Sequence, residues 1–300
     1  MTIGGVSPVL EVPFLDDGSL DLPGFDRVVE AVLATGVGSV MFPGYASEFH
    51  KLTGAERELL TDRLLGATAG VAGFTAVVSV PDHATVVAVE VARRAAERGA
   101  GALNLLPPYL LGPSRDAVLA HLGAVLDAVA PLPVVLQYAP AQTGTSLDAA
   151  AIHALAGRHP NLGYVKVESA PPGRLISALE LPALVGYAGL QLPDALRRGA
   201  AGVQPGCSFT ELYQEIWRAW HEDDRPAALA LHSALLPYLS YWMQHVELIV
   251  AAEKAISVRR GWFASAHCRA PGWTLDAAEL AMVDRFMDEF GGRLPPLSRA

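Results

Sequence analysis

Short apolar runs rich in β-branched residues alternate with longer segments in which apolar residues recur at helical spacing. The short runs predict strands and the longer segments predict helices, because side chains repeat every two residues in a strand and about every 3.6 in a helix. The expected strands are residues 6–11, 39–42, 74–80, 102–106, 134–138, 163–167, 183–187 and 202–204. The expected helices are residues 23–34, 53–69, 82–98, 115–129, 147–158, 174–179, 192–198 and 209–222.

Eight strand–helix units over about 220 residues predict an α/β fold, a (β/α)8 barrel of the TIM type. An open doubly wound sheet is the alternative, but the connection after the first strand lacks a Gly-x-Gly-x-x-Gly phosphate loop. Beyond residue 223 the pattern is helical throughout, with helices expected at 226–243, 246–260 and 275–290. We therefore predict a barrel domain over residues 1–223 and a C-terminal helical region packed on it over residues 224–300.

Composition limits the classes of function. Of the 300 residues 51% are hydrophobic, yet no apolar run reaches the roughly 18 residues that suggest a membrane span. A formal net charge of −9 argues against a nucleic-acid partner, because phosphate binding needs a basic stripe. The segment from Met1 to Gly5 lacks the basic start and apolar stretch of a signal peptide, so we expect a cytoplasmic protein with no membrane partner.

Lysine is rare in this chain, with three lysines against nineteen arginines, and only Lys166 lies inside a predicted strand. Burial there disfavours the ammonium ion and favours the neutral amine, which can form a Schiff base with a carbonyl substrate. The alternative is a lysine that extends from a strand end into water. Alternation puts Lys166 and Glu168 on one face, where Glu168 could shape the pocket or accept a proton.

Polar residues at other strand ends complete the candidate site, because the active site of a (β/α)8 barrel lies at the carboxyl ends of its strands. The turn after the second strand could offer N–H and O–H groups to a carboxylate. The candidates for substrate binding, besides Glu168, are Gly44, Tyr45, Ala46, Ser47, Glu48, Tyr109 and Gln204, and those for catalysis, besides Lys166, are Gln137 and Tyr138. The histidines show no paired ligand spacing, so no metal or other cofactor is expected.

Together these features resemble the dihydrodipicolinate synthase and N-acetylneuraminate lyase superfamily, class I lyases that bind pyruvate or another 2-keto acid as a Schiff base. The residues from Gly44 to Glu48 match the family's Gly-Thr-Thr-Gly-Glu loop, and those from Gln137 to Gly144 match its Tyr-Asn-Val-Pro-x-x-Thr-Gly segment. Lys166 matches the Schiff-base lysine. The resemblance implies a barrel enzyme, a small-molecule 2-keto acid substrate and a homo-oligomer, either a dimer or a tetramer.

The chain departs from the family pattern at three positions. A gapless alignment puts Gln137 where the family has its proton-relaying tyrosine, whereas a shift by one residue would restore Tyr138 and require a compensating gap. We favour the gapless alignment. The arginine with which the synthases bind the second substrate's carboxylate is replaced by Gln142, and the tyrosine they donate between subunits corresponds to Leu110 or Tyr109.

A closer likeness is to the branch that contains 2-keto-3-deoxyarabonate dehydratase, in Ser47-Glu48-Phe49, in Gln137 followed by Ala139-Pro140-Ala141, and in Lys166-Val167-Glu168. We therefore predict a Schiff-base-forming lyase, a dehydratase or aldolase of a 2-keto-3-deoxy sugar acid or a similar 2-keto acid. One alternative is a 4-hydroxy-tetrahydrodipicolinate synthase that condenses pyruvate with aspartate semialdehyde. The other is a non-catalytic 2-keto acid binding protein on the same scaffold, because a fold does not fix a function.

Overall fold

The computed structural model describes residues 3–295, which form two compact units that interleave in the sequence. The first unit comprises residues 3–7, Ser39–Phe42 and Gly70–Gln204, and the second comprises Pro8–Gly38, Pro43–Ala69 and residues 205–295. The division at residue 223 stays a prediction. The outermost parts of its two ranges, residues 1–2 and 296–300, lie outside the described residues.

All eight strands belong to the first unit and pair in parallel. Their order, β1-β8-β7-β6-β5-β4-β3-β2, follows the chain without reversing, whereas a doubly wound sheet reverses its strand order at a switch point. The order therefore confirms the predicted (β/α)8 arrangement. The strands are β1 (Gly5–Val6), β2 (Ser39–Phe42), β3 (Thr75–Val80), β4 (Ala102–Leu105), β5 (Val134–Tyr138), β6 (Leu162–Val167), β7 (Ala183–Val185) and β8 (Gly202–Val203).

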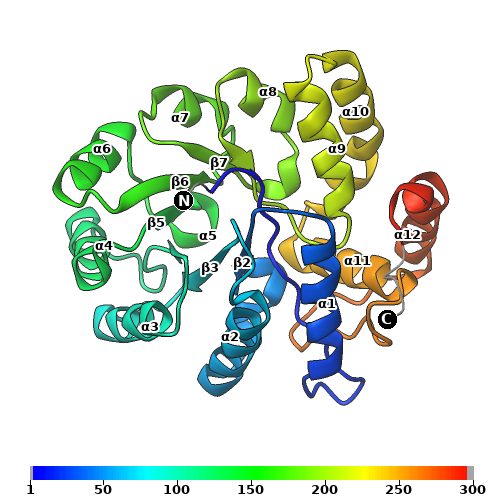
Figure 1. Ribbon diagram of the computed structural model, residues 1–300, viewed down its shortest axis with the longest axis horizontal. Helices are drawn as coiled ribbons and strands as arrows, with labels where there is room; N and C mark the ends of the chain where they lie inside the picture. Colours follow the sequence, from blue (N-terminus) through cyan, green and yellow to red (C-terminus); the bar gives the residue numbers. More distant parts are fainter. Residues whose placement is uncertain (1–2, 296–300) are drawn as a thin grey trace. The chain divides into compact units, whose positions relative to one another are not determined.

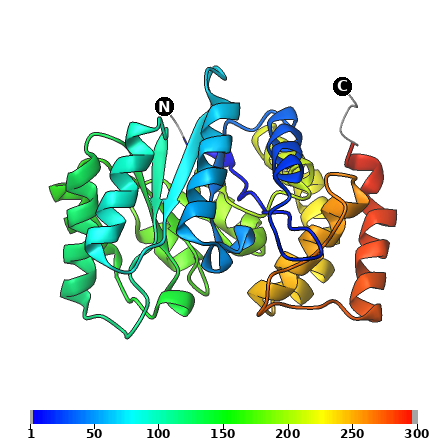
Figure 2. The same ribbon diagram turned by 90° about the horizontal axis from the view of Figure 1, so that it is seen from below.

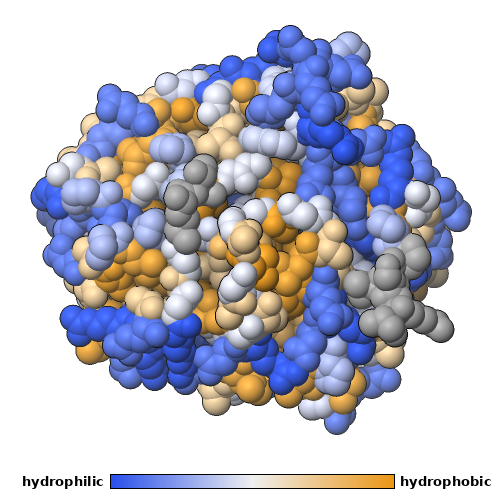
Figure 3. All heavy atoms as spheres, in the orientation of Figure 1, coloured by the Kyte–Doolittle hydropathy of each residue, from blue (hydrophilic) through white to orange (hydrophobic). Residues whose placement is uncertain are grey.

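The helices of the first unit follow its strands, and Figure 1 shows α3, α4, α6 and α7 on the outer side of β3 to β7. Their apolar faces explain this placement: α3 buries Ala88, Ala92 and Ala95, while Figure 3 shows hydrophilic side chains gathered over the same helix. The helices are α3 (Thr85–Glu97), α4 (Arg115–Val129), α5 (Pro140–Thr143), α6 (Ala149–Arg158), α7 (Gly173–Ala178) and α8 (Leu192–Arg197).

Three local differences from the predicted elements have identifiable causes. The first strand ends at Val6 instead of residue 11, since the partner strand is followed by Pro205, which has no N–H to donate to the ladder. The seventh ends at Val185, because Tyr187 and Ala188 adopt left-handed backbone conformations with φ of 50° and 49°. An additional single-turn helix, α5, begins at Pro140 and ends before Gly144, whose φ is 66°.

The second unit is helical in its described part and includes the three helices predicted near the C-terminus. Its helices are α1 (Leu22–Ala34), α2 (Gly54–Thr68), α9 (Thr210–His221), α10 (Arg225–Trp242), α11 (Val246–Arg259) and α12 (Ala277–Phe290). Figure 2 shows α12, in red, beside α11, in orange. Phe286 on α12 forms part of the core, with its ring centroid 5.1 Å from that of Phe209 and 5.4 Å from that of Trp242. None of the helices in residues 3–295 is long and apolar enough to span a membrane.

Candidate active site

Lys166 lies near the carboxyl end of β6 and is only 3% exposed. Its Nζ atom is 3.3 Å from Oε1 of Glu168, which is also buried. The two side chains share one face because they are two residues apart. The lysine is therefore enclosed beside a carboxylate instead of extending into water.

A row of buried polar side chains connects this pair to three neighbouring strands. Gln137 on β5 stands opposite Lys166 in the sheet register, and its Nε2 donates to Oε2 of Glu168 at 2.7 Å. Asn104 on β4 donates from Nδ2 to Oε1 of Gln137 at 2.8 Å and to Oγ of Ser79 on β3 at 2.8 Å. All five side chains are buried, so their hydrogen bonds form away from water, where each is worth more than at the surface.

Glu168 fits against the end of β7 because residue 186 is glycine. A Cβ atom at Gly186 would lie 2.3 Å from Cγ of Glu168 and 2.5 Å from its Oε1. The next residue, Tyr187, donates its hydroxyl to Oε1 of Gln142 at 3.4 Å. Burial raises the pKa of the Tyr187 phenol, the hydrogen bond to Gln142 lowers it, and the charge of Glu168 raises it further.

The structure separates the two candidates at the end of β5. Gln137 faces Glu168, whereas the adjacent Tyr138 points to the opposite face, as neighbouring residues of a strand do. The hydroxyl of Tyr138 accepts a hydrogen bond from the backbone N–H of Leu147 at 3.3 Å. Gln137 and not Tyr138 therefore shares a hydrogen-bonded network with Lys166.

Two other predicted residues of the first unit lie outside this network. Gln204, just beyond β8, is buried and donates from Nε2 to Oγ of Ser7 at 3.3 Å. Tyr109 lies in the loop after β4, with its ring 6.2 Å from that of His83 in an edge-on arrangement. Nδ1 of His83 also accepts from the backbone N–H of Leu110 at 3.0 Å, which holds this loop in place.

The predicted carboxylate-binding loop belongs to the second unit and contains a 3-10 turn, Tyr45–Ser47. The backbone N–H of Gly44 donates to Oγ of Ser47 at 2.9 Å, and that hydroxyl donates to the carbonyl oxygen of Leu10. These bonds hold Ser47 at the base of the turn. Ala46 completes the turn and is half-buried.

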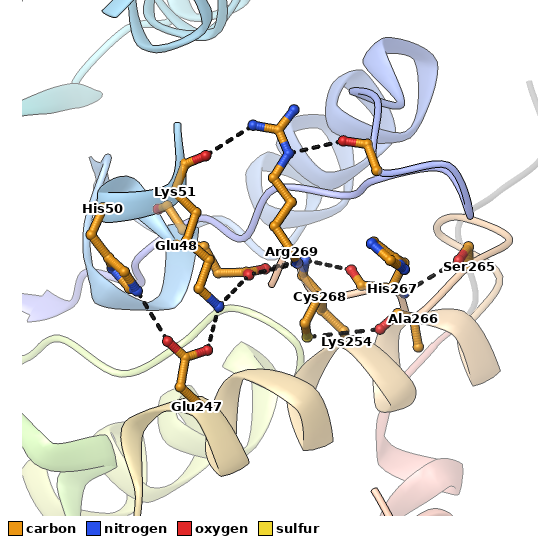
Figure 4. Close-up of polar contacts among 12 residues, drawn as sticks. Glu48, His50, Lys51, Glu247, Lys254, Ser265, Ala266, His267, Cys268 and Arg269 are labelled. Atoms are coloured by element: carbon orange, nitrogen blue, oxygen red, sulfur yellow. Dashed lines mark hydrogen bonds and ion pairs between the residues drawn. The ribbon is translucent and has the colours of Figure 1, made fainter. Parts of the chain in front are cut away.

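Glu48 ends this loop in a left-handed conformation, with φ of 52°, and is fully buried. Figure 4 shows its carboxylate between two lysines: Oε1 pairs with Nζ of Lys254 on α11, and Oε2 lies 2.9 Å from Nζ of Lys51. Oε2 also accepts from the backbone N–H of Arg269 at 3.1 Å. The carboxylate thus has internal partners that hold an unusual backbone conformation in place.

The charges around Glu48 extend to other parts of the second unit (Figure 4). Burial lowers the pKa of Lys51, but hydrogen bonds to Glu247 and Glu48 outweigh that effect and raise it overall. Lys254 also donates to the carbonyl oxygen of His267 at 2.9 Å, and its Nζ lies 4.3 Å from the ring centre of Phe14. Lys51 and Lys254 are therefore structural cations with carboxylate partners.

Four residues of this site were not among those predicted from the sequence: Ser79, Asn104, Gly186 and Tyr187. An asparagine in the apolar run Ala-Leu-Asn-Leu is a visible signal, because a buried polar side chain must find partners. The sequence has no corresponding signal that residue 186 must be glycine to leave space for Glu168. Across residues 3–295, no group of His, Cys, Asp and Glu side chains has an arrangement that could hold a metal ion.

Comparisons with known proteins place the chain in one family. The sequence profile of the dihydrodipicolinate synthetase family matches residues 2–289. An L-2-keto-3-deoxyarabonate dehydratase from Azospirillum brasilense is 29% identical over 299 residues, which cover 95% of this chain and 94% of that protein. A 4-hydroxy-tetrahydrodipicolinate synthase from Exiguobacterium sibiricum is 30% identical over 243 residues, 79% of this chain and 81% of the synthase.

Solved structures give the same fold. The E. coli K12 prophage protein YagE, solved in complex with pyruvate, superposes with a TM-score of 0.88 at 23% identity, over 97% of this chain and 99% of YagE. A dihydrodipicolinate synthase from Rhodopseudomonas palustris gives a TM-score of 0.86 at 23% identity, over 95% and 97% of the two chains. The chain belongs to the dihydrodipicolinate synthetase family, whose members are class I lyases that form a Schiff base.

Proposed function

We propose that this chain is a Schiff-base lyase for a hydroxylated 2-keto acid, such as a 2-keto-3-deoxy sugar acid. The observation that carries the proposal is the buried pair of Lys166 and Glu168, with Nζ and Oε1 3.3 Å apart. Transfer of a proton from Lys166 to Glu168 leaves a neutral amine, which is the nucleophilic form. The pair thus contains both the nucleophile and the first proton acceptor.

The proposed reaction proceeds through an iminium ion on Lys166. The neutral amine attacks carbon C2 of the 2-keto acid, and Glu168 returns the lysine proton to the oxygen at C2. The amine nitrogen gives a second proton to the same oxygen, which leaves as water. The Glu168 carboxylate then removes the proton from C3, and the electrons of that C–H bond form an enamine. In dehydration the enamine expels the C4 hydroxyl group, which takes the proton from Glu168 and leaves as water. In aldol cleavage the iminium ion reacts directly: Glu168 removes the proton of the C4 hydroxyl group, the C3–C4 bond breaks, and its electrons form the enamine as C4 becomes an aldehyde carbon.

For the remaining substrate contacts we propose roles by sequence resemblance. The loop of Gly44, Tyr45, Ala46 and Ser47 binds the substrate carboxylate in this proposal, and Glu48 holds the loop through its own salt bridges. Tyr109 and Gln204 are proposed to bind substrate hydroxyl groups. We assign proton transfer to Glu168 and not to Tyr138, whose hydroxyl accepts from Leu147.

The preference for a hydroxylated substrate over a second carboxylate rests on Gln142. This neutral side chain accepts a hydrogen bond from Tyr187, at the position where the resemblance expects the arginine of the synthases. Neutral donors suit hydroxyl groups, whereas an arginine would offer a charged, bidentate partner to a carboxylate. Arg115 does not supply this charge freely, since its Nη2 pairs with Asp148 at 3.0 Å.

Two parallel assays of the purified protein test the proposal. One couples pyruvate with aspartate semialdehyde, and the other follows dehydration or pyruvate release from 2-keto-3-deoxy sugar acids. We expect activity in the second assay and little in the first; condensation alone would favour the synthase. Borohydride treatment with pyruvate, followed by mass spectrometry, distinguishes the lyase and the synthase from a non-catalytic binding protein. The binding protein would give no adduct at Lys166.

By the same resemblance we propose a homo-oligomer, a dimer or a tetramer. Light scattering of the purified protein would measure its mass against the 31.6 kDa of one chain. A mass equal to one chain at micromolar concentration would contradict this part of the proposal.

A further inference from the structure

The carboxamide of Gln137 has a donor side and an acceptor side, and the structure orients both. Its Nε2 faces Oε2 of Glu168 at 2.7 Å, and its Oε1 faces Nδ2 of Asn104 at 2.8 Å. A carboxylate can only accept hydrogen bonds, so the Nε2 side suits Glu168 when that group is ionised. The opposite orientation would bring Oε1 of Gln137 against Oε2 of Glu168, which is favourable only when Glu168 carries a proton.

Asn104 presents the donor side of its carboxamide to Gln137. It is fully buried on β4, and its Nδ2 supplies two N–H groups, one to Ser79 and one to Gln137. With a donor at this position, the acceptor side of Gln137 must face Asn104. Because β3, β4 and β5 are adjacent strands of one sheet, these side chains are held on rigid elements.

We infer that Asn104 is a positioning residue which, through Gln137, keeps Glu168 in its proton-accepting carboxylate form. The inference rests on the proposed function, in which Glu168 removes the C3 proton. Asn104 does not touch the substrate in this scheme. It acts on Glu168 through Gln137, which lies between them. Lys166 and Tyr187 are titratable groups that face Glu168, and both are retained in the variants described below.

When Asn104 no longer donates, the carboxamide of Gln137 can rotate so that its Oε1 faces Glu168. The protonated form of Glu168 then gains a hydrogen-bond acceptor, and the ionised form loses a donor. A general base must be unprotonated to act, so removal of the C3 proton would require a higher pH in such a variant. Formation of the iminium on Lys166 would still be possible, because the nucleophile itself is unchanged.

Pyruvate provides a probe that needs no knowledge of the natural substrate. Borohydride trapping of pyruvate reports the Schiff base, and loss of the pyruvate methyl signal in D2O, followed by proton NMR, reports removal of the C3 proton. Both are measured across pH for the parent protein, Asn104→Leu and the isosteric Asn104→Asp. Ser39→Ala is the control, because Ser39 is a buried serine on β2 outside the hydrogen-bonded row.

We expect both Asn104 variants to trap pyruvate, while the acid limb of their exchange profile moves up by about one pH unit. This corresponds to roughly tenfold slower exchange on that limb. Ser39→Ala should keep the parental profile.

If one Asn104 variant fails to fold, as judged by circular dichroism, the other carries the test. An Asn104 variant that folds and keeps the parental midpoint would overturn the inference, whereas a parent protein that traps no pyruvate would instead refute the proposed function.

Discussion

Gln137 donates an N–H to Glu168 at 2.7 Å, from the position where the family resemblance expects a proton-relaying tyrosine. A tyrosine hydroxyl can pass a proton on, but a carboxamide at neutral pH can only hold a hydrogen bond. We therefore propose that the acid–base chemistry falls to Glu168, the carboxylate that Gln137 holds, and not to the residue on β5. In the proposed mechanism the pair of Lys166 and Glu168, with Nζ and Oε1 3.3 Å apart, supplies the nucleophile and the base together.

Replacement of Lys166 tests the covalent step. Lys166→Ala should form no borohydride adduct and should lose at least about a thousandfold in turnover, because the nucleophile is gone. Its circular dichroism spectrum should match that of the parent. Lys166→Arg is the matched control, since it keeps a cation beside Glu168 but cannot form an imine. Parental turnover in either variant would disprove the Schiff-base mechanism.

Gly186 gives a test of where Glu168 must lie. Gly186→Ala should displace the carboxylate, because the new Cβ would fall 2.3 Å from Cγ of Glu168. We expect a drop in turnover of roughly tenfold or more, with about 1–3 kcal/mol lost in unfolding free energy. Gly163→Ala on β6 is the control, as a Cβ there meets nothing within 4 Å. Equal turnover in Gly186→Ala and Gly163→Ala would show that catalysis does not depend on the position of the Glu168 carboxylate.

The barrel could be predicted from the sequence because its evidence is local and repeated. Period-two apolar runs and helical segments alternate, and even the short β8 was placed within one residue. Lys166 was identifiable for a similar reason: it is a lysine in a run of aliphatic residues in a chain that otherwise uses arginine. The strand–helix alternation and the setting of Lys166 can both be read from residues that are close together in the sequence.

The rest of the site depends on contacts between residues far apart in sequence. Asn104 and Gln137 are 33 positions apart, and only strand pairing brings their side chains together. Glu48 was predicted to bind substrate, yet its carboxylate pairs with Lys254, which lies 206 positions away. The turn residues gave no sign of that partner. Strand geometry puts Gln137 and Tyr138 on opposite faces of β5, but the sequence does not show which of them meets Glu168.

Removal of one partner from the buried salt bridge between Glu48 and Lys254 should destabilise the protein strongly. Lys254→Met leaves Glu48 buried with one cation fewer, and removal of one partner from such a pair costs about 3–5 kcal/mol. Denaturant unfolding measures this cost. The double variant Glu48→Gln with Lys254→Met should lose less than the sum of the two single variants, since neither partner is then left alone. Additive losses would show that the two side chains do not interact.

Two buried carboxyl groups of the second unit predict how stability depends on pH. Burial raises the pKa of Glu11 to about 8, and burial also raises that of Glu253 to about 7. Between the ordinary value of 4.5 and these values the folded protein holds protons that the unfolded chain has released. Their contribution to the unfolding free energy is therefore fully present below pH 4.5, falls as the pH rises, and levels off above about pH 8.

The variant Glu11→Gln isolates this effect, because it keeps the side chain's shape but cannot ionise. Its unfolding free energy minus that of the parent should rise between pH 5 and pH 8 and then level off, as only the parent must ionise Glu11, while both proteins retain Glu253. Taking the difference removes shared contributions such as His121, whose pKa burial lowers and which acts with the opposite sign. Glu215→Gln is the control, since Glu215 is an exposed partner of Arg293. A difference that does not change with pH would mean that Glu11 ionises in the folded protein as readily as in the unfolded chain.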